Sequence, residues 1–145
     1  MDGVTMTSEQ KAGLLARVSL FEGLPQPSLA ALADLAAEVE FGDGDAIVIQ
    51  GQVGTGLFIV VSGAARVVKG GEELARLGPG EYLGELAVID RMPRMASAFA
   101  VGPTTCLALA SWDLFRRVDA DHELVHSLLR GLALRVRRFS EQHSH

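Results

Sequence analysis

Hydrophobic and polar positions change their rhythm three times along the chain. In residues 1–38 apolar residues recur at spacings of three and four, as expected for helices that bury one face. A corner of one glycine and two prolines at 23–27 divides this region, so we expect two short N-terminal helices, the second beginning near Pro27 or Ser28. The second apolar stripe consists of Leu29, Leu32, Ala36 and Val39.

Between residues 39 and 110, glycines separate short runs of Val, Ile, Leu and Phe. Short strands with frequent turns favour a small sandwich or closed roll over a parallel sheet with crossover helices. The alternation stops within 80–98, where residues 85–89 form a pattern typical of one helical turn. We expect strands near 46–50, 57–62, 64–69, 73–77, 97–101 and 104–109.

Helical rhythm returns over residues 111–141. Ser111 is a candidate cap for a helix at 112–118, and a longer helix is expected from about Asp121 to Phe139. The near-heptad stripe of this helix is compatible with packing on its own domain, closing over a ligand, or pairing with a second copy in a homodimer. The stripe consists of Val125, Leu128, Leu132, Val136 and Phe139.

Composition limits the classes of protein that fit this pattern. The 145 residues, with 48% hydrophobic content, match a single domain spanning 1–145. A formal net charge of −5 disfavours nucleic-acid binding, and apolar runs such as 57–61 are too short to cross a bilayer. The lone Cys106 forms no internal disulfide and fits a reducing compartment. We therefore expect a soluble cytoplasmic domain that binds neither nucleic acid nor membrane.

The segment from Gly84 to Arg94 has the chemistry of an anion site. A short helix opened by glycine offers unpaired backbone N–H groups and a partial positive charge. The guanidinium of Arg94 would add paired donors that match phosphate oxygens. Glu85, at the helix start, can accept hydrogen bonds from a sugar hydroxyl. Together these residues predict a sugar-phosphate site.

At these residues the sequence resembles the cyclic-nucleotide-binding domains of protein kinase A regulatory subunits and the bacterial catabolite activator protein. The resemblance rests on 80–89 and 93–98, which match the phosphate-binding cassette of that family, and on the glycines in 44–51 and 57–63. It implies a mainly β, α+β fold: an eight-stranded antiparallel β-roll, jelly-roll-like, with N-terminal helices, a short cassette helix and two C-terminal helices.

The resemblance also implies a ligand and a site. The ligand would be cAMP, with cGMP as the other candidate. Arg94 would bind the cyclic phosphate, Glu85 the ribose 2′-hydroxyl, and the surrounding backbone the phosphate, while ligand binding would move the last helix. Met95 departs from the Ser, Thr or Ala frequent at its position, so a hydroxyl that favours cGMP is missing. The predicted site residues are Gly84, Glu85, Leu86, Ala87, Arg94, Met95 and Ala96.

Other functions were weighed against this one. Metal-dependent enzymes on β-rolls need histidines and carboxylates on the strands. The four histidines instead lie at 122, 126, 143 and 145, so we expect no enzyme, no metal and no cofactor. Some relatives carry a DNA-binding helix-turn-helix after the long helix, so a partner domain elsewhere or an unknown effector stays open. The alternative function is a degenerate domain that mediates protein interaction or dimerisation without ligand.

Overall fold

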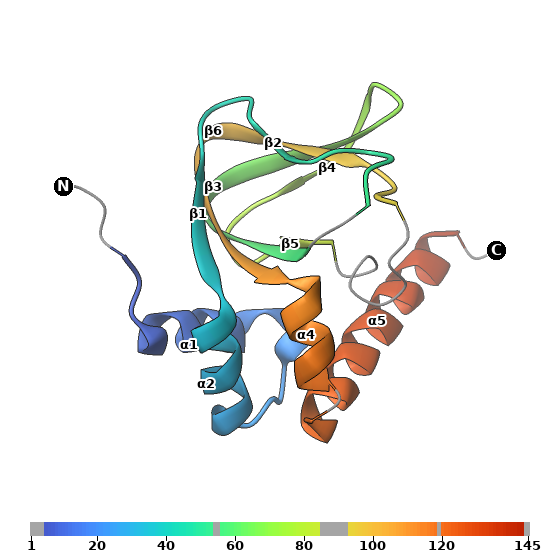
Figure 1. Cartoon of the computed structure of the whole chain (residues 1–145). Coiled ribbons are helices and arrows are strands. Elements are labelled where there is room, and N and C mark those ends of the chain that lie inside the picture. The colour runs from blue at the N-terminus through green and yellow to red at the C-terminus, as the bar shows by residue number, and fades with distance from the viewer. Residues whose placement is uncertain (1–4, 54–55, 85–92, 119, 144–145) are drawn as a thin grey trace.

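A computed structural model describes residues 5–53, 56–84, 93–118 and 120–143. In these residues a curved antiparallel sheet stands on a base of helices, and the last helix runs up beside the sheet (Figure 1). The helices are α1 (Ser8–Arg17), the short 3-10 helix η1 (Ser19–Phe21), α2 (Gln26–Leu35), α4 (Ser111–Val118) and α5 (His122–His143). The strands are β1 (Ala37–Phe41), β2 (Ala46–Val48), β3 (Gly56–Lys69), β4 (Glu72–Leu77), β5 (Tyr82–Leu83) and β6 (Ser97–Ala110).

The two N-terminal helices begin where local chemistry provides a start. Thr7 and Gln10 form a capping box for α1, in which each side chain accepts a hydrogen bond from the other's backbone N–H. Helix α2 begins at Gln26, with Pro27 in its first turn. One prediction is wrong here. Val39 belongs to β1, because the chain leaves α2 at Ala36 in an extended conformation and pairs with β6.

The sheet is organised around one long pair of strands. Its order is β1-β6-β3-β4, with β2 also paired to β6 and β5 paired to β3. Where eight strands were expected, the described residues contain six. The reason is that β3 and β6 each run through a position where we predicted a break between two strands, bending at register shifts between Val60 and Ala64. Strands β1 and β5 were missed by the sequence prediction.

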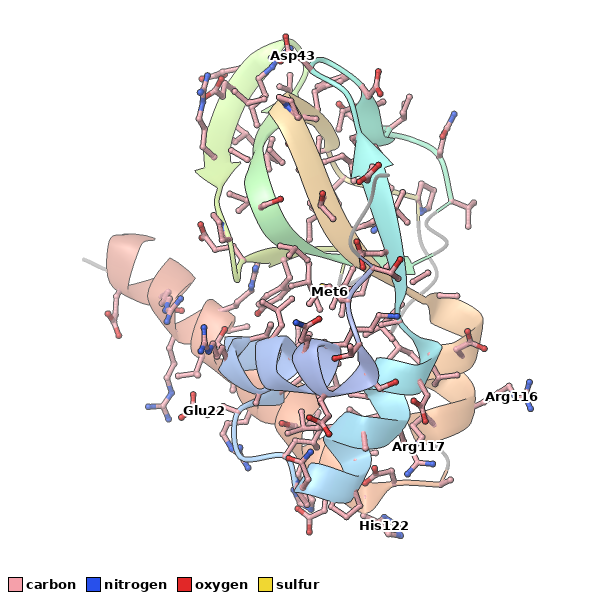
Figure 2. All side chains as sticks on the ribbon, turned by 90° about the vertical axis from the view of Figure 1, so that its left-hand side faces the viewer. Met6, Glu22, Asp43, Arg116, Arg117 and His122 are labelled. Atoms are coloured by element: carbon pink, nitrogen blue, oxygen red, sulfur yellow. The ribbon has the colours of Figure 1, made fainter. Side chains whose placement is uncertain are left out.

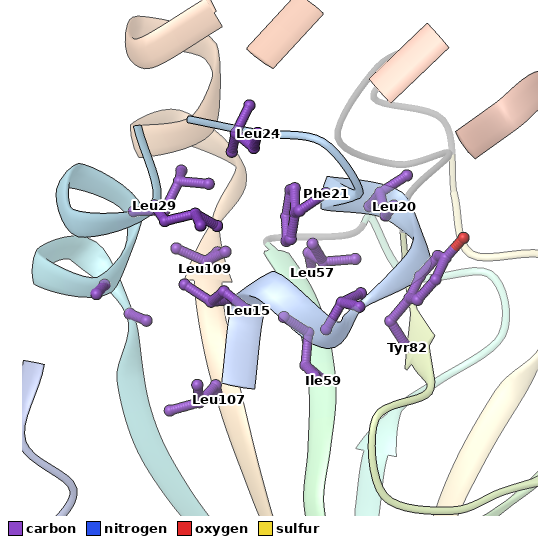
Figure 3. Packing of buried hydrophobic residues seen from close by; sticks show 14 of the residues in the cluster. Leu15, Leu20, Phe21, Leu24, Leu29, Leu57, Ile59, Tyr82, Leu107 and Leu109 are labelled. Carbon is purple, nitrogen blue, oxygen red and sulfur yellow. The ribbon is translucent and has the colours of Figure 1, made fainter. Parts of the chain in front are cut away.

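The buried side chains form two separate clusters. The first, called the base cluster, joins α1, η1, α2, α4 and α5 to the lower part of the roll (Figure 3). The second, called the roll cluster, fills the upper roll with Ile47, Val60, Ala65, Ala98 and Cys106. The labelled members of the base cluster in Figure 3 are Leu15, Leu20, Phe21, Leu24, Leu29, Leu57, Ile59, Tyr82, Leu107 and Leu109.

Helix α5 rests on η1 through a close approach of backbones. A Cβ at Gly131 would lie 2.7 Å from Leu20 Cδ1 and 3.1 Å from Leu20 Cα, so only glycine lets the two elements pack this closely. Ser127 Oγ and Arg130 Nη1 both donate to the Glu22 carbonyl oxygen, at 3.1 Å and 2.7 Å. Side chain, backbone and glycine thus hold the first half of α5 to the base.

The predicted single apolar stripe of α5 needs correction. Leu124 and Leu128 are buried in the base, whereas Leu129 and Val136 are 60% and 64% exposed. Val125 and Leu132 are half-buried. Helix α5 therefore has an inner face that packs on the domain and a separate outer apolar face. The side chain of Phe139, the last residue of the predicted stripe, lies outside the description.

Figure 2 shows how the chain start joins the two layers. Met6 lies between the helices and the roll, and its amide donates to Glu38 Oε1 of β1 at 2.6 Å. Asp43 marks the opposite end of the roll, where it accepts from the Gly102 amide at 2.7 Å. No helix in the described part of the chain combines the length and apolarity needed to cross a membrane.

Candidate functional site

The backbone of Arg94 is held in place by hydrogen bonds on both sides of the residue. Its amide donates to the Gln52 carbonyl oxygen at 2.8 Å, and its carbonyl oxygen accepts from the Gly51 amide at 2.9 Å. A neighbouring bridge pairs Val53 with Pro93. These contacts join the turn before β3 to the segment before β6 at Arg94. They set the direction in which the Arg94 side chain leaves the backbone.

The Arg94 side chain is buried beneath the roll surface. The residue is 8% exposed, and its Nη2 donates to the Gly56 carbonyl oxygen at 2.6 Å. A guanidinium keeps its charge at any physiological pH, and its flat set of donors matches the oxygens of phosphate. Arg94 and Gly84, two of the predicted site residues, therefore lie next to each other, and their contact with a phosphate stays a prediction.

Gly84 provides the space into which the guanidinium fits. Its φ of +97° lies in the region that side chains rarely adopt. A Cβ there would overlap Arg94 Nη1 and would lie 2.6 Å from the Gly56 carbonyl oxygen. Glycine is therefore required twice at this position, once by the backbone angle and once by the arginine.

The other predicted site residues fall into two groups. Met95 is 63% exposed and Ala96 is half-buried, both directly after the buried arginine. Ser97 Oγ accepts from the Gln50 amide at 2.8 Å, which ties this segment again to the turn before β3. The remaining predictions, Glu85, Leu86 and Ala87, lie outside the described residues, as does the expected helical turn at 85–89.

Half-buried apolar side chains of the upper roll pack against the roll cluster. Phe58 pairs with Leu83 across β3 and β5, and its ring meets Phe41 edge-on with centroids 6.3 Å apart. Val48 is also half-buried and packs against the same cluster. Large apolar side chains that are partly exposed are typical of the lining of a small-molecule site, where a flat ring can pack against them.

Sequence reasoning missed three residues around this site. Gly56 accepts the Arg94 hydrogen bond, and a Cβ there would lie 2.8 Å from the Leu109 carbonyl oxygen. Tyr82 of β5 is 5% exposed and contacts Arg135 of α5. A glycine directly before the long apolar run was the available signal for Gly56. The Tyr82 contact joins residues 53 positions apart, so spacing along the chain gave no signal for it.

The described residues offer little chemistry of other kinds. His122 and His126 are exposed, and no three His, Cys, Asp or Glu side chains gather as metal ligands in the ranges the structure covers. Burial raises the pKa of the Cys106 thiol to about 11. Because a thiol must ionise to act as a nucleophile, Cys106 is a packing residue.

Comparisons with known proteins show relatives with the same fold. The chain is 33% identical over 131 residues to the CRP-like cAMP-activated global transcriptional regulator of Mycobacterium tuberculosis, covering 86% of the chain and 58% of the regulator. The crystal structure of Thermus thermophilus catabolite activator protein matches with 34% identity and a TM-score of 0.76, covering 86% of this chain and 61% of that one. The chain thus spans less than two thirds of both relatives.

A eukaryotic relative and a family profile extend these matches. The regulatory domain of Toxoplasma gondii protein kinase A, solved with cAMP, is 27% identical with a TM-score of 0.77, covering 90% of this chain and 50% of that one. The profile of the cyclic nucleotide-binding domain covers residues 38–121, from β1 through the Arg94 segment to the start of α5. With more than half of its length matched, the chain belongs to the cyclic nucleotide-binding domain family.

Proposed function

We propose that this chain is a regulatory sensor that binds cAMP through Arg94 and Gly84 and transmits binding to α5. The observation that carries the proposal is the buried Arg94 guanidinium, held beside a glycine that leaves room for it. A guanidinium keeps its charge in the protein interior and presents a flat set of donors, which suits it to an anion with several oxygens. A cyclic phosphate carries one negative charge and two free oxygens, which match a guanidinium fork.

The rest of the proposed ligand site follows from the neighbours of Arg94. Glu85 would accept from the ribose 2′-hydroxyl, and the backbone of Leu86, Ala87 and Ala96 would line the phosphate. The base would lie against half-buried apolar side chains such as Phe58. Met95 brings no hydroxyl to the guanine amino group, which favours adenine. The names of the Mycobacterium and Toxoplasma relatives, which mention cAMP, support the same choice.

Signalling by α5 is part of the proposal. The helix touches the base through Gly131 and the short strand before Gly84 through Arg135. A ligand that binds one position of the helix more tightly than another shifts the population of those positions. The regulated partner, whether a domain of the same protein or a separate effector, would read this movement. We place the action in the cytoplasm, where a lone buried cysteine stays reduced.

Titration calorimetry of the wild-type chain with cAMP and cGMP tests the site. Arg94→Ala is expected to weaken cAMP binding by about 30-fold or more, because charge-assisted contacts to a buried anion are worth about 2 to 5 kcal/mol. Arg94→Lys keeps the charge but loses the fork, so an intermediate loss is expected. Arg76→Ala is the matched control, since Arg76 is an exposed arginine paired with Glu73 on β4.

The outcomes separate sensor from interaction module. Tight cAMP binding that Arg94→Ala abolishes and Arg76→Ala leaves intact supports the sensor. Absence of heat with either nucleotide at about millimolar concentration would contradict the sensor, because a Kd of that size corresponds to a binding free energy of only about 4 kcal/mol. Thermal unfolding of each variant shows whether a lost affinity reflects the site or a lost fold.

A second candidate function, dimerisation, is favoured by the outer face of α5. Val125, Leu129, Leu132 and Val136 follow one another at spacings of four, three and four, which is the heptad seam of a coiled coil. Leu129 and Val136 are the most exposed of the four. A second copy of the chain presents the same seam, so the two faces would match each other.

Sedimentation equilibrium tests dimerisation independently of ligand. The double substitution Leu129→Glu and Val136→Glu is expected to convert a dimer to monomer, because four carboxylates would meet across the seam. Glu exchange at two exposed positions outside the seam, Leu74 on β4 and Val53, is the control. At about 100 μM the experiment detects a dimer whose association free energy is about 5.5 kcal/mol or stronger. A wild-type chain that stays monomeric at this concentration would contradict the dimer.

A further inference from the structure

Arg135 of α5 clasps Tyr82 of β5 at three places. Its Nε donates to the Tyr82 hydroxyl at 3.2 Å, its Nη2 donates to the Tyr82 carbonyl oxygen at 3.4 Å, and its guanidinium lies 4.5 Å from the centre of the Tyr82 ring. Ring, hydroxyl and backbone of one residue are thus all held by one arginine. Helix α5 and strand β5 are 53 positions apart where they meet.

The clasp lies at the outer end of the tethered part of α5. One turn before it, Gly131 packs on Leu20. After it, Val136, Arg137 and Arg138 are exposed. Among the described contacts of α5, Arg135 makes the last that joins the helix to the roll. Because the described contacts of α5 beyond Gly131 with the roll are those of Arg135, their release would let the outer part of the helix move while its first half stays held to the base.

Tyr82 connects this clasp to the Arg94 site. Strand β5 is only two residues long, Tyr82 and Leu83, and Gly84 follows directly. The Tyr82 ring is buried at the edge of the base cluster (Figure 3), and its backbone pairs with Ile59 of β3. A hydrogen bond to the Tyr82 carbonyl oxygen therefore acts on the chain that leads into Gly84, where the lack of a side chain leaves room for Arg94.

We infer that Arg135 is a positioning residue that couples the position of α5 to the phosphate site through Tyr82. The inference rests on the proposed cAMP binding, and it adds the residue pair that carries the signal. With the clasp closed, β5 is held and Gly84 stays in register with Arg94. Nucleotide affinity and docking of α5 therefore rise together.

The chemistry of the clasp explains why an arginine is needed. Its planar guanidinium can stack on a ring and donate along its edge at the same time, whereas an ammonium does one or the other. Arg135→Lys should therefore weaken cAMP binding nearly as much as Arg135→Ala does, although lysine keeps the positive charge. Tyr82→Phe keeps the ring and the backbone oxygen and loses only the hydroxyl, so a smaller effect is expected.

Two measurements on the full chain test the coupling. Calorimetry is expected to show about tenfold weaker cAMP binding for Arg135→Ala and a smaller loss for Tyr82→Phe. In the Arg135→Ala background, Tyr82→Phe should add nothing further, because the two act as a pair. Arg137→Ala, the same change at an exposed position two residues away, is the matched control. Amide hydrogen exchange of residues 132–143 reports α5 docking directly, with faster exchange expected only when the clasp is lost.

The outcomes keep this inference apart from the proposed function. If Arg135→Ala binds cAMP as Arg137→Ala does, or more tightly, the coupling is overturned while cAMP binding stands. If the wild-type chain binds no cyclic nucleotide, the proposed function fails and the coupling fails with it. In that case the exchange of 132–143 still shows whether Arg135 tethers the helix. Unchanged exchange in Arg135→Ala overturns the clasp whatever the chain binds.

Discussion

The two hydrophobic clusters of this domain differ in what fills them. The base cluster contains 18 buried residues, mostly Leu with Phe21, Ile59 and Tyr82 among them, and draws on every helix. The roll cluster contains five, of which Ala65, Ala98 and Cys106 are small. The larger side chains that pack against this cluster, including Phe41 and Phe58, are only half-buried. Most of the buried apolar surface therefore lies in the base, while the apolar side chains around the roll cluster keep part of their surface exposed.

Strand β5 lies on the border between these regions. Tyr82 belongs to the base cluster, and Leu83 packs against the roll cluster. Two consecutive residues therefore face the two halves of the molecule, as alternation along a strand requires. Under the inferred coupling, a displacement on either side of this border would move the peptide before Gly84.

Truncating one leucine in each cluster should give the largest contrast. Leu107 is fully buried in the base cluster, whereas Leu77 is only half-buried beside the roll cluster. Leu107→Ala is expected to lower the free energy of unfolding by about 3 to 5 kcal/mol, because a cavity would remain at this fully buried site. Leu77→Ala is expected to lower it by about 1 kcal/mol, because a half-buried side chain leaves little cavity. Urea unfolding followed by circular dichroism measures both. Equal losses would mean that the two clusters are packed alike.

Adding a methyl group where α5 meets η1 should give a smaller effect. Gly131→Ala is expected to destabilise the fold by about 1 to 3 kcal/mol, because the new Cβ would press on the Leu20 backbone. Gly13 of α1 is the matched control, since it is exposed and a Cβ there meets nothing within 4 Å. Gly13→Ala should instead stabilise by up to about 1 kcal/mol, the helix preference for alanine. Thermal unfolding compares the pair, and a neutral Gly131→Ala would show that α5 does not need close contact with the base.

How far the sequence predicts this molecule depends on whether the signal is local. The helices and the strands with strong apolar runs could be found, because caps, prolines and periodicity act within a few residues. The break expected near residue 63 was wrong, since a glycine that usually ends a strand here bends β3 within a continuous pairing with β6. Strand β5 has two residues and carries no periodicity to detect.

The candidate site follows the same rule. Arg94 and Gly84 could be named in advance because their chemistry lies within one short segment. The partners that fix them come from elsewhere in the chain. Gly56 accepts from Arg94 across 38 positions, and Arg135 holds Tyr82 across 53. The α5 stripe was predicted as one face because periodicity shows which residues share a side, and only packing shows which of two apolar sides turns inward.

The base and the roll also differ in how their carboxylates are held. Burial alone would raise the pKa of Asp121 at the start of α5, but hydrogen bonds from Ser28 Oγ at 2.5 Å and from the Leu124 amide at 3.2 Å lower it overall. On the roll, the hydrogen bond from Arg76 lowers the pKa of the exposed Glu73. A carboxyl whose folded pKa is depressed stabilises the fold above its unfolded pKa, and this contribution is lost as the pH falls through the folded value.

Lowering the pH should therefore destabilise the packing of the helices through Asp121. Protonation of Glu73 should leave the free energy of unfolding unchanged. Ser28→Ala is expected to cost about 1 to 3 kcal/mol at neutral pH, because Asp121 stays buried with one donor fewer. Much of that difference should vanish as the pH falls through the folded pKa of Asp121, which lies below the ordinary pKa of an aspartate. Glu73→Gln should follow the wild type at every pH, since water replaces an exposed partner at little cost. Urea midpoints measured across this range decide the matter: a Ser28→Ala penalty independent of pH would show that the hydroxyl only fills space between α2 and α5.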